Sequence, residues 1–279
     1  MPSGNKKNTN KKSTKKKNIK KKTQEKAVVT DSKPAVKKGR AGLIALVLIA
    51  AVILAGVFMS VDYYTAWGND EKLINRAMDA AEKNAIYKKY PEVLRKYNYI
   101  VGRWENDENY KEYVRQAKLG IAKAYKDSQQ YIPAIEAYRA LTAEYSAEKG
   151  DMYAWLMLEL GECYNSILNT NDALKTYTEI TQQFPDTDWS AEAIFGIADA
   201  YRNNGDSGKA MYYYNKIVEK YKKGFLSAEA LTSIGKMYES DGDDKKALEI
   251  YSRVVKEYPE IVTEYAKMRQ TVLNDRVKN

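Results

Sequence analysis

Apolar residues follow two different patterns along the chain. Residues 41–61 contain no charged residue, and a helix of this length is about 30 Å long at about 1.5 Å per residue, which matches the hydrocarbon core of a bilayer. From about residue 69 onward, apolar residues instead recur every three or four positions, as they do in amphipathic helices. Short polar turns, such as residues 203–206 and 241–244, separate segments of helical length. The pattern predicts an all-α chain in which one transmembrane helix precedes a series of antiparallel helix pairs.

The helix pairs repeat with a period close to 37 residues. One tyrosine recurs at intervals of 39, 37 and 37 residues, an alanine follows nine positions later, and a second tyrosine stands four positions further on. Small residues allow the two helices of a pair to cross closely, and the tyrosines are expected to fill the space between successive pairs. In the turns, Asp172 or Asp244 would cap the second helix. The predicted packing residues are Tyr125, Ala134, Tyr138, Gly161, Tyr164, Ala173, Tyr177, Tyr201, Ala210, Tyr214, Gly235, Tyr238, Ala247 and Tyr251.

Two copies of the repeat carry a motif of a known family. LGECY at 160–164 and IGKMY at 234–238 are each followed by the alanine, the tyrosine and a closing proline, and in this they resemble the tetratricopeptide repeat. The other two copies have Ala122 and Ala198 at the glycine position and lack the proline. The period exceeds the family standard of about 34 residues, and longer units of this kind resemble the repeats of bacterial envelope proteins, such as outer-membrane assembly lipoproteins and division coordinators. The resemblance implies an α-solenoid with one concave face.

The segments outside the clear repeats are assigned from pattern and composition. The first 40 residues are rich in Lys, Asn, Thr and Ser, and such a segment cannot bury enough apolar surface to offset its ordering entropy. Residues after Pro259 are expected to form a helix that caps the open end of the solenoid. The predicted organisation is a disordered basic tail at 1–40, a transmembrane helix at 41–61, an atypical helical pair or linker outside the repeat register at 62–111, four repeats within 112–259 (112–148, 151–185, 188–222 and 225–259) and a capping helix at 260–279.

Charge is distributed unevenly about the predicted span. Residues 1–40 hold 15 basic and two acidic residues, a formal charge of +13, so the other 239 residues carry −4. Positive residues beside a span remain in the cytoplasm, which places the tail there and the repeats outside, in the periplasm of a cell with two membranes. Tyr63, Tyr64 and Trp67 are expected at the far membrane interface. The tail is expected to bind anionic lipid, with a specific cytoplasmic partner as the alternative, and the acidic folded part disfavours nucleic acid.

Few residues are available for catalytic chemistry. The chain has no histidine and one cysteine, which excludes histidine-dependent catalysis, cysteine-rich metal sites and an intramolecular disulfide. Cys163 is expected to pack in the core, with a reactive thiol as the alternative. The acidic turn at 241–244 is followed by Lys245 and Lys246 and not by calcium ligands. We therefore expect a protein that is not an enzyme and that has no cofactor or metal.

The resemblance also indicates where a partner would bind. It places residues of each first helix on the concave face, which would be apolar in the middle with mixed charge and suited to a helix or extended segment with an apolar stripe. The face lacks the regular Lys/Asn/Arg pattern with which some tetratricopeptide domains hold a terminal carboxylate, so that ligand is disfavoured. The predicted groove residues are Leu119, Lys123, Trp155, Leu158, Glu162, Phe195, Asp199, Arg202 and Lys236.

These features together favour a membrane-anchored scaffold that binds protein partners outside the cytoplasm. Its setting would be a bacterial envelope machine for export, outer-membrane assembly, division or motor function. One alternative is a translocon-associated holdase that uses the same groove for unfolded clients. A more remote alternative is an enzyme that uses Cys163 or a pair of carboxylates.

Overall fold

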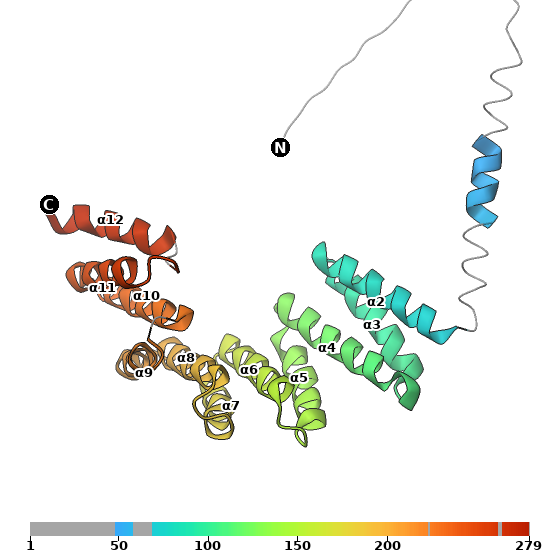
Figure 1. Cartoon of the computed structure of the whole chain (residues 1–279), viewed down its shortest axis with the longest axis horizontal. Coiled ribbons are helices and arrows are strands. Elements are labelled where there is room, and N and C mark those ends of the chain that lie inside the picture. Colours follow the sequence, from blue (N-terminus) through green and yellow to red (C-terminus); the bar gives the residue numbers. More distant parts are fainter. Residues whose placement is uncertain (1–47, 58–68, 223, 262–263, 279) are drawn as a thin grey trace, which may run out of the picture. The chain divides into compact units, whose positions relative to one another are not determined.

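The computed structural model describes residues 48–57, 69–222, 224–261 and 264–278 (Figure 1). The chain divides into two units, Met1–Val61 and Asp62–Asn279. In the first unit, residues 48–57 are helical and exposed. The predicted tail, the rest of the predicted span, and Tyr63, Tyr64 and Trp67 lie outside the described residues. Within the described ranges, no helix has the length and apolar character needed to cross a membrane.

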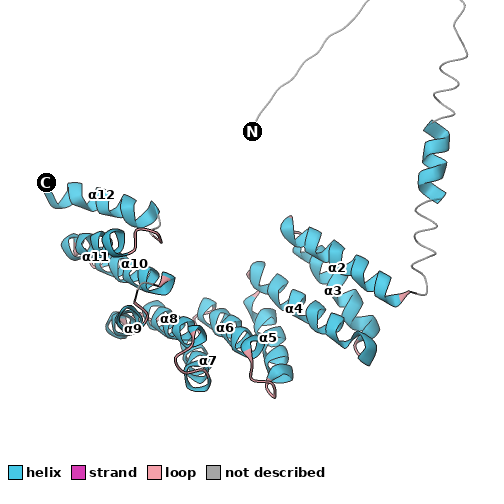
Figure 2. Cartoon of the chain, viewed as in Figure 1, coloured by secondary structure: helices cyan, strands magenta, loops and turns pink. Residues whose placement is uncertain are grey.

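The second unit consists of helices joined by short turns, and its described residues include no strand (Figure 2). A single-turn 3₁₀ helix, η1, lies between the third and fourth α-helices. The elements are α2 (Asp70–Ile86), α3 (Tyr90–Trp104), η1 (Glu108–Tyr110), α4 (Lys111–Asp127), α5 (Tyr131–Tyr145), α6 (Asp151–Ser166), α7 (Thr170–Gln183), α8 (Asp188–Asn203), α9 (Ser207–Lys220), α10 (Phe225–Ser240), α11 (Asp244–Glu257) and α12 (Glu264–Lys278).

Packing between the helices follows their order in the chain. Each α-helix of the second unit packs against the next, and α6 also contacts α8, which contacts α10. The first helices of three successive pairs therefore adjoin one another, and Figure 1 shows the pairs α6/α7, α8/α9 and α10/α11 in sequence. The predicted all-α solenoid of antiparallel helix pairs is confirmed.

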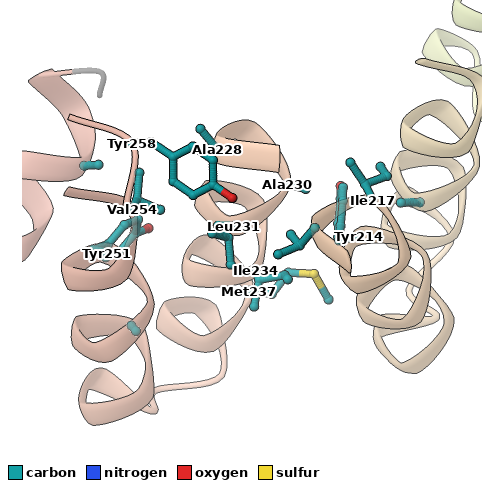
Figure 3. Close-up of a cluster of buried hydrophobic side chains, with 14 of the residues drawn as sticks. Tyr214, Ile217, Ala228, Ala230, Leu231, Ile234, Met237, Tyr251, Val254 and Tyr258 are labelled. Carbon is teal, nitrogen blue, oxygen red and sulfur yellow. The ribbon is translucent and has the colours of Figure 1, made fainter. Parts of the chain in front are cut away.

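The second tyrosines of the repeats are the largest fully buried side chains in the described part of the chain. Tyr138, Tyr177, Tyr214 and Tyr251 are at most 1% exposed, and the alanine four positions before each of them is fully buried. The first-helix tyrosines, at positions such as Tyr125, are only half-buried. Figure 3 shows the arrangement around α10, whose apolar residues lie between those of α9 and those of α11. A continuous core of this kind joins repeats that could not bury their apolar faces alone.

Glycine makes room for the second-helix tyrosine. A Cβ added at Gly161 would lie 2.5 Å from Cε1 of Tyr177, and one added at Gly235 would lie 2.8 Å from Cε1 of Tyr251. A Cβ added at Gly196, in the next repeat, would lie 2.4 Å from Cζ of the same Tyr177 ring. Real Cβ atoms do not approach other atoms so closely, so each glycine permits a helix crossing that alanine would obstruct.

The capping residues of the second helices stand one to three positions before the expected ones. The side chains of Asn169, Asp206 and Asp243 accept hydrogen bonds from the backbone N–H groups three residues later. The expected caps, Asp172 and Asp244, instead lie inside the first turn of α7 and α11. There their negative charge still favours the positive end of the helix dipole.

The N-terminal helix pair holds the repeat register at a wider spacing. Val93, Tyr97 and Ile100 of α3 are buried and stand 41 residues before the corresponding Ala134, Tyr138 and Leu141 of α5. The Tyr97 ring packs against Gly120 as the Tyr177 ring packs against Gly196. The pair α2/α3 therefore packs like a further repeat. Its sequence does not show the repeat motif, because η1 lengthens the spacing and Val93 stands where the other copies have alanine.

The last helix covers the exposed end of the final repeat. Ala266 and Leu273 of α12 are fully buried, and Arg269 Nε donates to Glu239 Oε2 of α10 at 3.1 Å. The hydroxyl of Tyr251 donates to the same carboxylate oxygen at 3.3 Å. This cluster ties the three final helices together through groups that are largely shielded from water.

Candidate partner-binding groove

A groove of about 730 Å³ opens between α6, α8 and the start of α10. We call it the α6–α10 groove. Four of the predicted partner-binding residues line it: Leu158, Glu162, Phe195 and Asp199. The contact of α6 with α8, and of α8 with α10, brings these residues from separate repeats onto one surface.

The floor of the α6–α10 groove is apolar. Leu158 is buried, and the half-buried Phe195 ring packs edge-on against Tyr214 at 5.4 Å between centroids. Two residues at the start of α10, Phe225 and Leu226, extend the apolar lining. Phe225 is 60% exposed. The groove therefore has an anchored apolar base and one large apolar ring that is open to a partner.

Carboxylates surround this apolar floor. The described lining contains Glu162, Asp188, Glu192, Asp199 and Glu229, and includes neither lysine nor arginine. The pKa of Glu192 is raised, first by partial burial and then by the negative charges of Glu162 and Asp188. Burial and the charge of Asp199 likewise raise the pKa of Glu229, which nearby Lys236 partly opposes. Both shifts arise chiefly from partial burial in the groove, with a smaller contribution from neighbouring carboxylates.

Two of these carboxylates already have partners within the repeats. Glu162 forms an ion pair with Lys126, and Asp199 forms one with Arg202 at 2.9 Å while accepting a hydrogen bond from the Tyr214 hydroxyl. The predicted groove residue Arg202 is thus engaged in holding α8 against α9, since it also donates to the Tyr214 hydroxyl at 3.0 Å.

The other three carboxylates are free to meet a ligand. Asp188, Glu192 and Glu229 are exposed and make no hydrogen bond or ion pair with any residue in the described part of the chain. Glu192 and Glu229 stand 37 residues apart, at the same position in successive repeats. Trp155 occupies this position in the preceding repeat. An acidic residue at this position is therefore found on α8 and α10 but not on α6.

A tyrosine hydroxyl in the groove also lacks a partner. The hydroxyls of Tyr138 and Tyr251 donate to Glu159 and Glu239 at 3.2 Å and 3.3 Å. Tyr177 is equally buried and lines the groove, but its hydroxyl has no hydrogen bond to a described residue. Burial, followed by the charges of nearby carboxylates, raises its pKa, so the group is a neutral donor at physiological pH. The buried hydroxyl of Tyr221, another lining residue, has no hydrogen-bond partner in the described part of the chain, although the Lys220 ammonium lies 5.3 Å from the centre of its ring.

The remaining predicted groove residues lie elsewhere on the first helices. Leu119 and Trp155 pack against the core of α4, α5 and α6, where the Trp155 ring meets Tyr138 edge-on. Lys123 is exposed on α4. Lys236 lines an adjoining pocket of about 300 Å³ at α10, which shares Phe225 and Glu229 with the groove. Its ammonium lies 4.8 Å from the centre of the Tyr265 ring. The nine predicted residues are therefore not brought together as one site.

Sequence reasoning missed the most accessible residues of the groove. Asp188, Glu192, Phe225 and Glu229 line it but were not among the predicted set. A signal was present for Glu192 and Glu229, because each stands nine positions before its repeat tyrosine, as Trp155 does. Phe225 occupies the first position of its helix, where the apolar pattern carries little information.

Cys163 lies in the core away from solvent. Its side chain is fully buried in the cluster formed by α4, α5 and α6. Burial raises the pKa of the thiol to about 12, although Lys126 acts in the opposite direction. A thiol in this state is a poor nucleophile. Among the described residues, no group of three or more His, Cys, Asp or Glu side chains is placed to hold a metal ion.

Three segments of the chain match the family model described as "Tetratricopeptide repeat". They are residues 155–187, 192–224 and 229–260, which correspond to the second, third and fourth predicted repeats. The predicted tetratricopeptide repeats are confirmed in this region. No curated protein matches the chain. Tetratricopeptide repeats form scaffolds for protein–protein interactions, so the chain carries an interaction module.

Solved structures share the fold at low sequence identity. A putative kinesin light chain repeat protein from Podosopora anserina is 15% identical with a TM-score of 0.52, over 65% of this chain and 94% of that one. BtubC (BKLC) from P. vanneervenii is 14% identical with a TM-score of 0.51, over 75% and 84%. Rap protein complexed with competence and sporulation factor is 14% identical with a TM-score of 0.53, over 72% and 57%. These likenesses support the helical-repeat fold.

Proposed function

We propose that this chain, which carries three tetratricopeptide repeats at residues 155–260, is a membrane-anchored scaffold that binds a protein partner through the α6–α10 groove. The observation that carries the proposal is the combination, within one groove, of exposed Phe225 with carboxylates that have no partner in the described chain. An apolar surface with a polar rim is typical of ligand-binding grooves and of protein interaction sites.

The setting we propose is the cytoplasmic membrane, with the repeats outside the cytoplasm as part of an envelope machine. Support comes from sequence: residues 41–61 have no charge, and the 40 residues before them carry +13. Positive charge on one flank is the usual determinant of orientation. In this arrangement the basic tail contacts anionic lipid and the repeats contact the partner.

We further propose that the scaffold acts by binding alone. Cys163, the residue on which the enzymatic alternative depends, is buried with a raised pKa. The groove carboxylates lie beside apolar groups and beside one another, an arrangement suited to recognition of a cationic segment. Tetratricopeptide proteins are in general scaffolds, which agrees with this assignment.

Co-purification of the full chain from detergent-solubilised membranes tests the proposal. Phe225→Ala is expected to lose the partner, because it removes the exposed apolar ring of the groove. Tyr212→Ala is the matched control, since Tyr212 is an aromatic residue of similar exposure, 63%, on α9 and outside the groove lining. Equal recovery of the partner with both variants would contradict the proposed site. One stoichiometric partner indicates a scaffold, whereas a heterogeneous set of unfolded chains indicates a holdase.

A further inference from the structure

We infer that the α6–α10 groove selects a partner segment in which Lys or Arg side chains flank large apolar residues. The inference rests on the proposed function and specifies the chemistry of the partner. It follows from three independent properties of the groove: the placement of its free carboxylates, its apolar floor and its unpaired hydroxyls.

The first property is the spacing of the free carboxylates. Glu192 on α8 and Glu229 on α10 occupy the same repeat position and so lie on the same side of two adjoining helices. Asp188 stands one helical turn before Glu192. Two or three cationic side chains of one bound segment can therefore each meet a carboxylate.

The basic residues closest to the groove do not neutralise it from within. Lys126 is shared between Glu159 and Glu162, with its Nζ 2.6 Å from Glu159 Oε2. Arg202 is held by Asp199 and the Tyr214 hydroxyl. Lys236 lines the adjoining pocket together with Phe225 and Glu229, and its charge partly offsets that of Glu229. Lys220, whose ammonium lies 5.3 Å from the centre of the Tyr221 ring, pairs with Asp186. Asp188 and Glu192 therefore have no cationic partner within the described chain and are open to a ligand.

The second property is the apolar surface between the acids. Leu158 and Phe195 form the floor, and Phe225 leaves more than half of its surface open to solvent. Polar cations alone would leave this surface exposed. A segment that places Leu, Ile, Met or an aromatic residue between its basic residues buries the apolar surface and pairs the carboxylates at once.

The third property is the pair of unpaired tyrosine hydroxyls. The hydroxyls of Tyr177 and Tyr221 have no hydrogen-bond partner among the described residues, and that of Tyr221 is buried. A buried polar group without a partner is unfavourable, and the Tyr177 hydroxyl borders the open groove. A backbone carbonyl of a bound segment can accept a hydrogen bond from Tyr177, and this contact favours a peptide over an isolated cation.

The chain contains one basic segment of its own, residues 1–40. Its charge of +13 suits the acidic rim, but its large apolar residues are few and separated by runs of Lys, Asn, Ser and Thr. It therefore supplies the charge that the groove requires without the apolar residues that would cover Leu158, Phe195 and Phe225. The groove is matched better by a basic and apolar segment of another protein.

Fluorescence anisotropy with the full chain in detergent tests the inference. The probes are three labelled peptides of equal length: one of alternating Lys and Leu character, one with Glu in place of Lys, and one with Ser in place of Leu. The first is expected to bind and the other two to bind at least about tenfold more weakly, with affinity for the first falling as salt increases.

Charge-matched variants locate the binding site. Glu192→Gln/Glu229→Gln is expected to weaken Lys–Leu peptide binding about three- to tenfold, the effect of losing two partly screened ion pairs. Glu136→Gln/Glu249→Gln is the control: it changes net charge equally at exposed positions of α5 and α11, outside the groove lining, and is expected to leave affinity unchanged. Thermal unfolding followed by circular dichroism verifies that both double variants are folded.

Each contrary result has a separate meaning. Equal binding of the Lys–Leu and Glu–Leu peptides, or equal loss in the two double variants, overturns the charge selectivity. Either result can be accompanied by loss of the co-purified partner from Phe225→Ala. In that case the proposed function is retained and only the charge selectivity is rejected. If a chain with its tail lysines changed to glutamine binds the Lys–Leu peptide far more tightly than the unaltered chain, the tail occupies the groove, and the assignment to another protein is overturned.

Discussion

The ring of Tyr177 occupies the space that a side chain on Gly196 would need, although the two residues belong to successive repeats. Tyr177 comes from α7, and Gly196 lies near the middle of α8. Both residues also line the α6–α10 groove. The contact that joins two repeats therefore shapes the floor of the proposed binding site.

Gly196→Ala is expected to destabilise the chain. The added methyl would overlap the buried Tyr177 ring, and overpacking of this kind is unfavourable by about 1–3 kcal/mol. Gly102→Ala is the control: it lies in helix α3 with no atom within 4 Å of the added Cβ, so it is expected to stabilise by about 0.5–1 kcal/mol. Urea unfolding followed by circular dichroism measures both changes. Similar stability for the two variants would contradict the contact.

Tyrosine-to-phenylalanine variants are expected to separate paired from unpaired hydroxyls. Tyr138→Phe removes the donor to Glu159 and is expected to destabilise by about 0.5–1.5 kcal/mol. Tyr177→Phe removes a hydroxyl with no partner among the described residues and is expected to change stability by less than about 0.5 kcal/mol while weakening Lys–Leu peptide binding. Unfolding free energy and peptide anisotropy are the measurements. The reverse order of stability would show that the hydroxyls are assigned incorrectly.

The buried thiol is expected to make stability fall in alkali. The pKa of Cys163 is about 12 in the folded chain, above its ordinary value of 9.0. Between these values the folded chain holds a proton that the unfolded chain has lost, so the free energy of unfolding decreases as pH rises from about 9 to about 12. Cys163→Ala is expected to flatten this decrease in a series of urea unfolding curves. The buried tyrosines, whose pKa values are also raised, contribute a further decrease above pH 10 in both proteins.

The proposed orientation predicts which part of the chain a protease reaches. Protease added to intact spheroplasts is expected to remove residues beyond the span and to leave the basic tail protected, because the positive flank remains in the cytoplasm. Immunoblotting with one tag at each end follows both parts. Full protection of the repeats, or release of the whole chain without detergent, would contradict the proposed anchor and orientation.

Much of the fold is readable from sequence because the repeat imposes the same packing several times. Tyr138 and Tyr214 share a register with their alanines, and a position that recurs at the same step of successive helix pairs must face the same core. The N-terminal pair escapes the pattern because η1 widens its spacing and Val93 replaces the alanine. The contact of Gly196 with Tyr177 is not predicted either. The motif places its small residue at Ala198, whereas the glycine that contacts the ring stands two positions earlier.

The groove is less predictable because charged residues on exposed helix faces follow no apolar period. Glu192 and Glu229 resemble any solvated glutamates until the contacts of α6, α8 and α10 place them around Phe195. Trp155 shows the opposite limit: its repeat position suggests the groove, yet its ring packs against Tyr138 in the core. The way successive helix pairs pack against one another decides which first-helix side chains stay exposed to solvent. The sequence of one helix does not specify this packing.

Site-specific photocrosslinking in living cells tests the central claim most directly. A photoreactive phenylalanine at position 225, within the α6–α10 groove, is compared with the same residue at position 212, which is similarly exposed on α9 outside the lining. We predict a discrete crosslinked protein from position 225 that is absent from position 212 and is weakened by Glu192→Gln/Glu229→Gln. A partner that crosslinks from position 212 and not from position 225 would contradict the claim that the groove is the binding site.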